Sequence, residues 1–403
     1  MPKICCKKNT KILRSFSNLS LCNKFLKKPL QKETKFTLKL SQCRSCGLLQ
    51  LNRALKANMI AQEHEWIRYY EPEDHLSNLS GKIKKVCKFP KKSTIAGITY
   101  KDDSLIKYLK KKIVSKSWRI KPKKDLKIKF ESAASETVLP KINSKNVLKL
   151  TKRYGKADLL VGRHILEHAP NTSLFLNQLK KLVKTNGYIL FEVPDCSKQI
   201  KYLDYTMLWE EHNLYFTPEI LKNYFKINFP NMSLVKFFNY KYPIENALLI
   251  LLKNNRKKNV KKRKYNPRKI LKITDNYSKN FNNVKNKIHE KLRSYKNKYG
   301  KIAIFGAGHI SIMFINLFNI GKYINFIIDD NANKQKHFMP GSKLPIKKSS
   351  ALINENIKLC LMSLNPNVEK KVIKKNKLFL KKGGKFISIF PYYKSKSIYS
   401  SFK

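Results

Sequence analysis

The stretch KIAIFGAGHISIMFINLFNIGKYINFIIDD (residues 301–330) carries the strongest fold signal in the sequence. An apolar run leads into Gly306-Ala-Gly308, an apolar helical pattern follows at residues 310–318, and a second apolar run ends on two aspartates. Strand, glycine turn, helix and strand in this order are typical of a doubly wound parallel sheet. We therefore predict an α/β fold around this stretch.

The glycine turn resembles a dinucleotide fingerprint, with Ser311 in the place of the third glycine and Asp329 at the end of the next strand. Glycine allows the backbone to approach a phosphate at a helix N-terminus, and the acid can accept hydrogen bonds from ribose hydroxyls. The turn therefore favours a nucleotide-phosphate site. A Rossmann-like unit without a ligand is the alternative reading.

Alternating patterns extend outward from this stretch and divide the chain into four parts. Residues 300–403 continue the alternation to the end, and a basic linker (253–269) with a helical stretch (270–299) precedes them. Residues 81–252 read as a second α/β domain, with apolar runs at 94–98, 157–161, 188–193, 234–238 and 247–252. The last two runs have no helix between them and predict an antiparallel pair. Residues 1–80 hold five of the eight cysteines and form a small N-terminal segment.

The composition describes a basic globular chain. Its 403 residues include 86 Lys+Arg against 26 Asp+Glu, a net charge of +60, and 42% of them are hydrophobic. Only 11 of the basic residues are Arg, the residue that reads base edges best, and Lys is spread over the whole chain. We expect no specific nucleic-acid partner. No apolar run approaches the roughly 20 residues of a membrane span, so we expect a cytoplasmic protein without a membrane partner.

Cys43-Arg-Ser-Cys46-Gly47 is half of a zinc site. Two thiolates with this spacing can bind one tetrahedral zinc ion, and glycine permits the tight turn. Two further ligands are needed, and Cys5, Cys6 and Cys22 are the candidates. A knuckle that binds no metal is equally compatible with the sequence.

Polar residues follow two predicted strands of the second α/β domain. His164-Ile-Leu-Glu167-His168 matches an inverted zinc-peptidase pattern. However, Pro170 and the strand directly before the motif do not suit a long helix that would present both histidines. The carboxyl end of a parallel strand, where α/β sheets bind ligands, fits better. Downstream, Glu211-His212 offers a pair that can exchange protons near neutral pH.

Together these motifs resemble the sugar C-methyltransferase family. The resemblance rests on Ala157-Asp-Leu-Leu, on the segment from His164 to Asn171, on Gly187-Tyr-Ile-Leu-Phe-Glu-Val-Pro-Asp195 and on Glu211-His-Asn-Leu-Tyr-Phe216. It implies a class I methyltransferase domain, an N-terminal zinc-binding segment and a C-terminal Rossmann-like domain. It also implies S-adenosylmethionine as cofactor and C-methylation of a nucleotide-linked deoxysugar through an enolate.

The resemblance assigns roles to residues of this sequence. His212, beside Glu211, would remove a proton next to a sugar ketone, and His168 with a tyrosine, Tyr69 or Tyr70, of which we select Tyr70, would hold the enolate. The cofactor would be held by Gly97, Asp102, Asp103, Arg163, His164 and Glu167. The nucleotide-sugar would be held by Gly306, Gly308, Asp329 and Tyr215. Zinc would be held by Cys43 and Cys46 with Cys5 and Cys6.

The sequence also departs from the family pattern. The cofactor loop retains one glycine, Gly97, and Lys121 stands where the family has an acid that bonds the ribose. Trp209 stands where the family often has a tyrosine. Two rival functions therefore remain open: an NAD(P)-dependent oxidoreductase that uses the C-terminal fingerprint, and a non-catalytic protein that binds a nucleotide-sugar or another anion.

Overall fold

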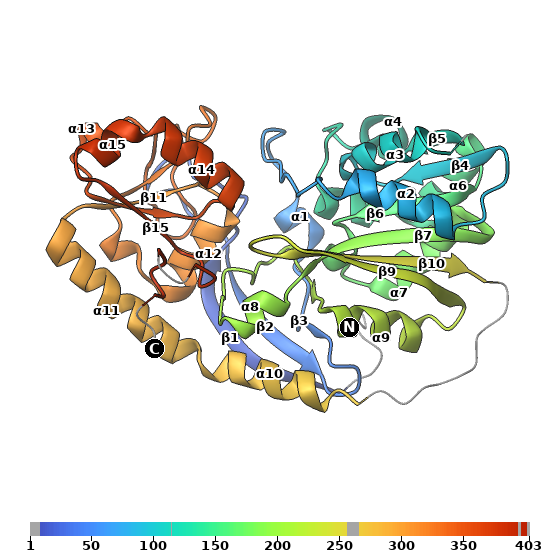
Figure 1. Ribbon diagram of the computed structural model, residues 1–403, viewed down its shortest axis with the longest axis horizontal. Helices are drawn as coiled ribbons and strands as arrows, with labels where there is room; N and C mark the ends of the chain where they lie inside the picture. Colours follow the sequence, from blue (N-terminus) through green and yellow to red (C-terminus); the bar gives the residue numbers. More distant parts are fainter. Residues whose placement is uncertain (1–8, 114, 256–265, 394–395, 401–403) are drawn as a thin grey trace.

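The computed structural model describes residues 9–113, 115–255, 266–393 and 396–400 of the chain. The described strands form sheets of four, six and five strands. Two α/β units, built on the six- and five-stranded sheets, lie side by side, and the four-stranded sheet lies in the lower middle of Figure 1. The predicted α/β class with two doubly wound units is confirmed.

The six-stranded sheet has the order β5-β4-β6-β7-β10-β9. Strands β4 to β7 pair in parallel, whereas β10 pairs antiparallel with both β7 and β9. The antiparallel pair expected from the sequence is therefore confirmed. The bounds are β4 (Ser93–Gly97), β5 (Ser115–Arg119), β6 (Ala157–Arg163), β7 (Val183–Asp195), β9 (Met232–Tyr240) and β10 (Asn246–Asn254).

Helices cover both faces of this sheet because successive residues of its buried strands point to opposite sides. In β6, Leu159 and Val161 pack with one group of helices, while Leu160 packs with the other. The first group is α2 (Leu76–Val86) and α3 (Asp103–Lys110), and the second is α6 (Ser144–Tyr154), α7 (Thr172–Lys181) and α9 (Pro218–Asn228). With both faces covered, the carboxyl ends of the strands are the place where a ligand can reach the sheet.

The short elements that follow strands of this sheet carry many of the polar residues described below. They are η1 (Tyr100–Asp102), α4 (Pro122–Leu126), α5 (Ser135–Val138), η2 (Leu139–Lys141), η3 (Leu166–His168) and α8 (Ser197–Lys201).

The five-stranded sheet is fully parallel, with the order β13-β12-β11-β14-β15. Its bounds are β11 (Ile302–Phe305), β12 (Phe326–Ile328), β13 (Ile346–Lys347), β14 (Leu359–Met362) and β15 (Lys385–Ser388). One face packs on α11 (Phe281–Tyr299) and α12 (His309–Phe318), and the other on α13 (Ala351–Asn354), α14 (Pro366–Lys375) and α15 (Lys377–Lys381). The strand order reverses between β11 and β14, and ligands of such sheets bind at this point.

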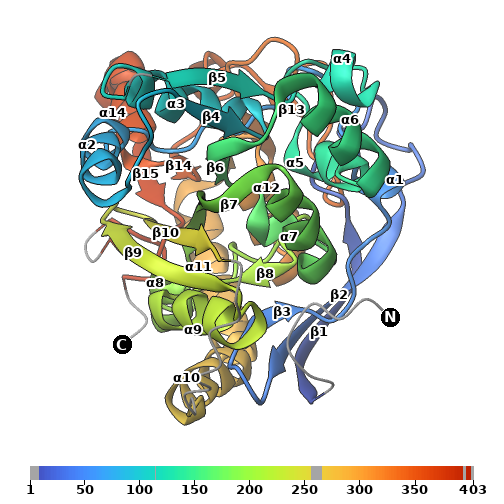
Figure 2. The ribbon, with the colours of Figure 1, turned by 90° about the vertical axis from the view of Figure 1, so that its right-hand side faces the viewer.

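The N-terminal sheet has the order β1-β2-β3-β8 and is not closed within the expected segment 1–80. Its strands are β1 (Thr10–Ser20), β2 (Lys35–Cys43), β3 (Leu49–Leu51) and β8 (Leu214–Tyr215), and β8 comes from the chain after the six-stranded sheet begins. Figure 2, which is turned by 90° from the view of Figure 1, shows these strands beside α10. The expected boundary at residue 80 also falls inside α2, so the first two segments share elements instead of meeting at a linker.

The helical stretch expected at 270–299 consists of two helices, α10 (Arg268–Lys279) and α11, which meet at Asn280. The expected linker begins later than predicted, because Lys253 and Asn254 belong to β10. Residues 256–265 of that linker lie outside the described residues. Among the described helices, none has both the length and the apolar character needed to cross a membrane.

Candidate active site

A cavity of about 630 Å³ lies between the two α/β units. It is bounded by residues at the carboxyl ends of β6 and β7 on one side and by the N-termini of α12 and α14 on the other. Its lining includes six carboxyl side chains (Glu71, Glu73, Asp74, Glu136, Asp204 and Glu245), two basic ones (Arg68 and Lys101) and four histidines (His164, His168, His212 and His309). The carboxyl groups outnumber the cationic ones even without Glu245, whose pKa burial raises to about 8, and with His164, whose pKa is about 10, counted as a cation. This excess contrasts with the +60 charge of the chain and favours a ligand that carries positive charge.

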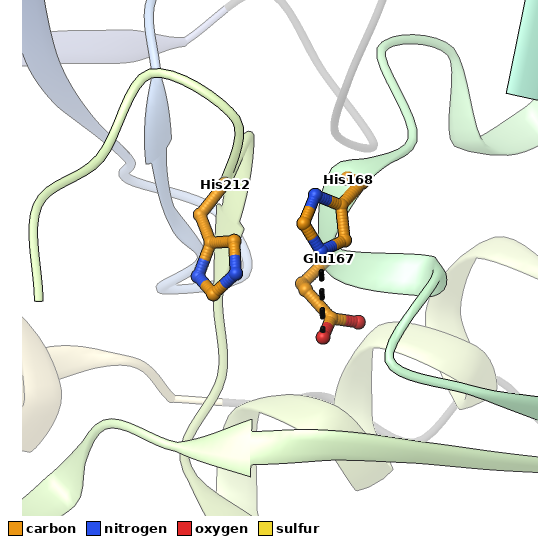
Figure 3. Close-up of side chains that lie close together, drawn as sticks. All are labelled: Glu167, His168 and His212. Atoms are coloured by element: carbon orange, nitrogen blue, oxygen red, sulfur yellow. Dashed lines mark ion pairs between the residues drawn. The ribbon is translucent and has the colours of Figure 1, made fainter. Parts of the chain in front are cut away.

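His168 lies at the centre of the reactive groups. It stands in η3, after β6, and its ring lies 4.6 Å from that of His212 at an interplanar angle of 90°. Its Nδ1 pairs with a carboxylate oxygen of Glu136, and its Nε2 lies 3.9 Å from Oε1 of Glu167. Figure 3 shows the two imidazoles facing each other, with the Glu167 carboxylate beside them.

Glu136 links His168 to a second carboxyl group. Burial opposes ionisation of Glu136, but the His168 imidazole holds the pKa of Glu136 below its ordinary value. Burial and the neighbouring Glu136 raise the pKa of Glu211 well above its ordinary value. The side chain of Asn23 donates to Oε1 of Glu211 over 3.0 Å. The N-terminal segment therefore helps to build the site.

His212 lies in an aromatic corner of the cavity. Trp209 stacks on His309 at 4.2 Å and lies 4.9 Å from His212, and Tyr69 packs against Trp209 at 5.0 Å. Burial and the nearby His168 and His309 hold the pKa of His212 well below its ordinary value. A neutral imidazole retains a lone pair, which can accept a proton or bind a metal ion.

Arg163, the last residue of β6, is fully buried and ties the strand ends together. Its Nε donates to Glu192 over 2.6 Å, and its Nη1 donates to Glu73 over 2.9 Å. Glu73 belongs to the segment 68–74, every residue of which lines the cavity. A second ion pair, Lys101 with Glu71 at 2.8 Å, anchors the same segment.

His164 does not face His168 in the way that a zinc-peptidase helix would require. It has a left-handed backbone with φ of 48°, and its Nε2 lies 3.2 Å from Glu192. Burial opposes its charge, but Glu71, Glu167 and Glu192 together raise its pKa to about 10. His164 is therefore a cation that balances buried acids.

The loop after β4 is closed on itself by Asp102. One carboxylate oxygen accepts from the backbone amides of Ile98 and Thr99, and the other accepts from the amide of Arg163 at 2.7 Å. A Cβ at Gly97 would come within 2.7 Å of Cδ1 of Ile106 and 3.0 Å of Cβ of Asp102, so a side chain there would have to displace these neighbours. Asp103 is half-exposed and pairs with Arg119 at 2.9 Å.

The C-terminal glycine turn is similarly occupied by protein groups. Asp329 accepts from the amide of Ala307 at 3.0 Å and pairs with Lys334 at 2.9 Å. The Lys334 ammonium also donates to the carbonyl of Ala307. The acid that a dinucleotide ribose would need therefore has protein partners already. Only the helix end, at His309 and Ile310, reaches the cavity.

Cys43 and Cys46 form the expected knuckle. Both are buried, and the amide of Gly47 donates to the carbonyl of Cys43 at 2.9 Å. Among the described residues, no third Cys, His, Asp or Glu completes a metal-sized group with them. Cys5 and Cys6 lie outside the described residues, so the expected zinc set stays a prediction.

The structure brings together some of the residues selected from the sequence and separates others. His168, His212 and Glu211 converge, but the phenol beside Trp209 is that of Tyr69, whereas the side chain of Tyr70 is 83% exposed. Tyr215 lies outside the lining, because its hydroxyl is bonded to the backbone of Trp209 in the core. Gly306, Gly308 and Asp329 lie behind the helix end, not in the lining.

Glu136 was missed by the sequence reasoning. It stands in α5, a four-residue helix between strands, in a stretch without a recognisable motif. The one signal available was an acid in a segment otherwise rich in Lys and Ser, and that signal is weak.

Comparison with protein families identifies two domains. Residues 95–228 match the model described as a methyltransferase domain, and residues 253–391 match the model described as a C-methyltransferase C-terminal domain. The first contains His168 and His212, and the second contains the glycine turn and α14. A search of curated proteins gave no match.

Solved methyltransferases resemble the chain at low similarity. A 1,6-didemethyltoxoflavin-N1-methyltransferase from Burkholderia thailandensis, with bound S-adenosylhomocysteine, is 10% identical with a TM-score of 0.30, covering 45% of this chain and 79% of that one. Magnesium protoporphyrin IX methyltransferase from Synechocystis PCC 6803 is 9% identical with a TM-score of 0.28, covering 45% and 82%. At these values the resemblance does not indicate what this chain binds.

Proposed function

We propose that this chain, a methyltransferase by the two domains that it carries, uses S-adenosylmethionine to methylate a carbon atom of a nucleotide-linked deoxysugar. The observation that carries the proposal is that His212, His168 and Tyr69 line one cavity, to which both domains contribute, with His168 beside His212 and Tyr69 beside Trp209. A base beside two hydrogen-bond donors is the arrangement that forms an enolate next to a ketone.

His212 is assigned to proton removal, and Tyr69 and His168 are assigned to charge stabilisation. His212 accepts the proton from the carbon beside the ketone. The Tyr69 hydroxyl and the His168 imidazole, held by Glu136, face the place where negative charge develops on the ketone oxygen. Trp209 packs against both Tyr69 and His212 and fixes their separation.

The donor set of the cavity fits the proposed cofactor. S-adenosylmethionine, when bound, supplies an electrophilic methyl group on a positively charged sulfur. The excess of carboxyl groups over cationic groups in the lining suits that charge. Lys101 and His164 would hold the carboxylate of the cofactor, and Asp103, once released from Arg119, would accept the ribose hydroxyls.

The nucleotide part of the substrate is assigned to the C-terminal side of the cavity. Residues at the start of both α12 and α14 line it, and these helices flank the point where the strand order reverses. Helix N-termini at such a point attract phosphate through backbone amides and the helix dipole. This side of the lining carries no carboxyl group among the described residues of α12 and α14, in contrast to the opposite side.

The experiment is a methyl-transfer assay with a nucleotide-linked keto-deoxysugar and labelled S-adenosylmethionine. We expect a C-methylated sugar from the native chain. His212→Gln, which keeps a polar side chain, should lower turnover by about 100-fold or more, the usual contribution of a general base. His337→Ala, outside the lining, is the matched control. A His212→Gln variant with native turnover would remove His212 as the base, and a product methylated on oxygen or nitrogen would contradict C-methylation.

A further inference from the structure

Three side chains of the cavity have the composition of a transition-metal site. One ligand atom each from Glu167, His168 and His212 lies within 4.8 Å of the other two. Small side-chain rotations bring such atoms to the separation of about 3.4 Å that a tetrahedral ion with bonds of about 2.1 Å requires. Two imidazoles and one carboxylate are donors that suit zinc, cobalt and iron(II).

Glu167 is a buried acid whose Oε1 lies near two imidazoles. The residue is fully buried, and neither of its carboxylate oxygens has a hydrogen bond within the described residues. Its nearest cationic groups are imidazoles, His164 at 3.4 Å and His168 at 3.9 Å. His164 balances the charge of Glu167, and a bound metal ion would in addition give its oxygens the direct bonds that they lack.

Glu136 supplies the outer support that metal-binding histidines usually have. It pairs with Nδ1 of His168, while Nε2 lies 3.9 Å from Oε1 of Glu167. A bound ion would replace the proton that Nε2 donates in the proposed reaction. A carboxylate on the far nitrogen fixes the tautomer and ring orientation of a metal ligand. His168 and His212 both line the cavity, so an ion there would keep a coordination position open to it.

We propose that Glu167, His168 and His212 bind a divalent transition-metal ion, with Glu136 as outer support, and that the bound ion switches off proton removal by His212. The switch rests on the proposed function, because the ion uses the same lone pair that His212 needs as a base. The binding site itself does not depend on that function.

The binding test is cobalt(II) titration of the full-length, tag-free chain, followed by visible absorption. Cobalt bound by nitrogen and oxygen gives visible bands alone, whereas cobalt at Cys43 and Cys46 adds a thiolate charge-transfer band in the near ultraviolet. We expect the visible bands to disappear in His212→Ala and Glu167→Gln. Glu136→Gln should weaken binding by about 10- to 100-fold. Glu167→Gln keeps the side-chain volume, and circular dichroism checks that each variant is folded.

His64→Ala and His337→Ala are the matched controls, because these imidazoles lie near each other outside the cavity lining. They should leave the cobalt bands unchanged. Absence of visible bands in the native chain, or bands that persist in both His212→Ala and Glu167→Gln, overturns the proposed site.

The switch is tested by proton exchange in heavy water. Zinc should stop deuterium incorporation beside the ketone of the nucleotide-linked sugar, and a chelator should restore it. Unchanged exchange in the zinc-loaded chain overturns the switch. A chain that binds cobalt but exchanges no proton without metal overturns His212 as the base, and with it the switch, while the binding site stands.

Discussion

The molecule contains two strand–turn–helix units, after β4 and after β11, whose turns are closed by different side chains. After β4, the turn holds one glycine, Gly97, and the carboxylate of Asp102 closes it by accepting hydrogen bonds from three backbone amides. After β11, the turn keeps Gly306, whose φ of 106° a side chain would strain, and Asp329 with Lys334 fills the ribose position. Both turns are therefore closed by an acid of the chain, whether the turn holds one glycine or two.

The largest effect is expected from removing the acid that closes the turn after β4. Asp102→Asn keeps the volume but places an amide group against a backbone N–H. The lost acceptor and the unmatched donors should lower the free energy of unfolding by about 2–4 kcal/mol. Urea denaturation followed by circular dichroism measures this loss.

Asp103→Asn is the control for that change, because Asp103 is half-exposed and its one ion pair is with Arg119. An exposed pair contributes about 0–1 kcal/mol. Equal losses in the two variants would show that Asp102 does not hold the turn.

The next largest effect is expected at Gly306, in the turn after β11. Gly306→Ala places a Cβ within 2.6 Å of Oγ of Ser363 and forces an unfavourable φ. We expect a loss of about 1–3 kcal/mol in unfolding free energy. Gly308→Ala, where a Cβ meets nothing within 4 Å, should lose less than about 1 kcal/mol. A larger loss for Gly308→Ala than for Gly306→Ala contradicts the described turn.

A smaller effect, on the pH dependence of stability, is expected from Glu245 on the acid-rich side of the cavity. Burial raises the pKa of Glu245 from its ordinary value to about 8. A raised carboxyl pKa stabilises the folded chain at low pH, and this stability is lost as the pH rises from about 4.5 through 8. Glu245→Gln should therefore flatten the decline in thermal stability over this window. An unchanged slope would mean that Glu245 is ionised in the folded chain.

Sequence patterns anticipated much of the fold for identifiable reasons. The run 302–305 became β11 because its four residues are apolar on both faces, which suits a central parallel strand. The boundary expected at residue 80 falls inside α2, and β8, a two-residue strand far along the chain, completes the N-terminal sheet. A strand that short leaves no periodic signal.

The residues of the site were harder to predict from the sequence than the fold was. His168 and His212 follow strand ends, so topology alone places them near one cavity. Glu136 and the choice between Tyr69 and Tyr70 depend on how irregular segments lie over the sheet. Tyr215 was selected from a motif, yet it packs in the core because its hydroxyl finds the backbone of Trp209.

Calorimetric titration of the full-length chain with S-adenosylmethionine, S-adenosylhomocysteine and NAD tests the central claim most directly. The acid-rich cavity should bind S-adenosylmethionine. It should bind S-adenosylhomocysteine more weakly, because that compound lacks the positive charge. NAD should give no heat, because Asp329 already binds Ala307 and Lys334. Binding of NAD without binding of either sulfur compound would contradict the account and favour the oxidoreductase reading of the C-terminal turn.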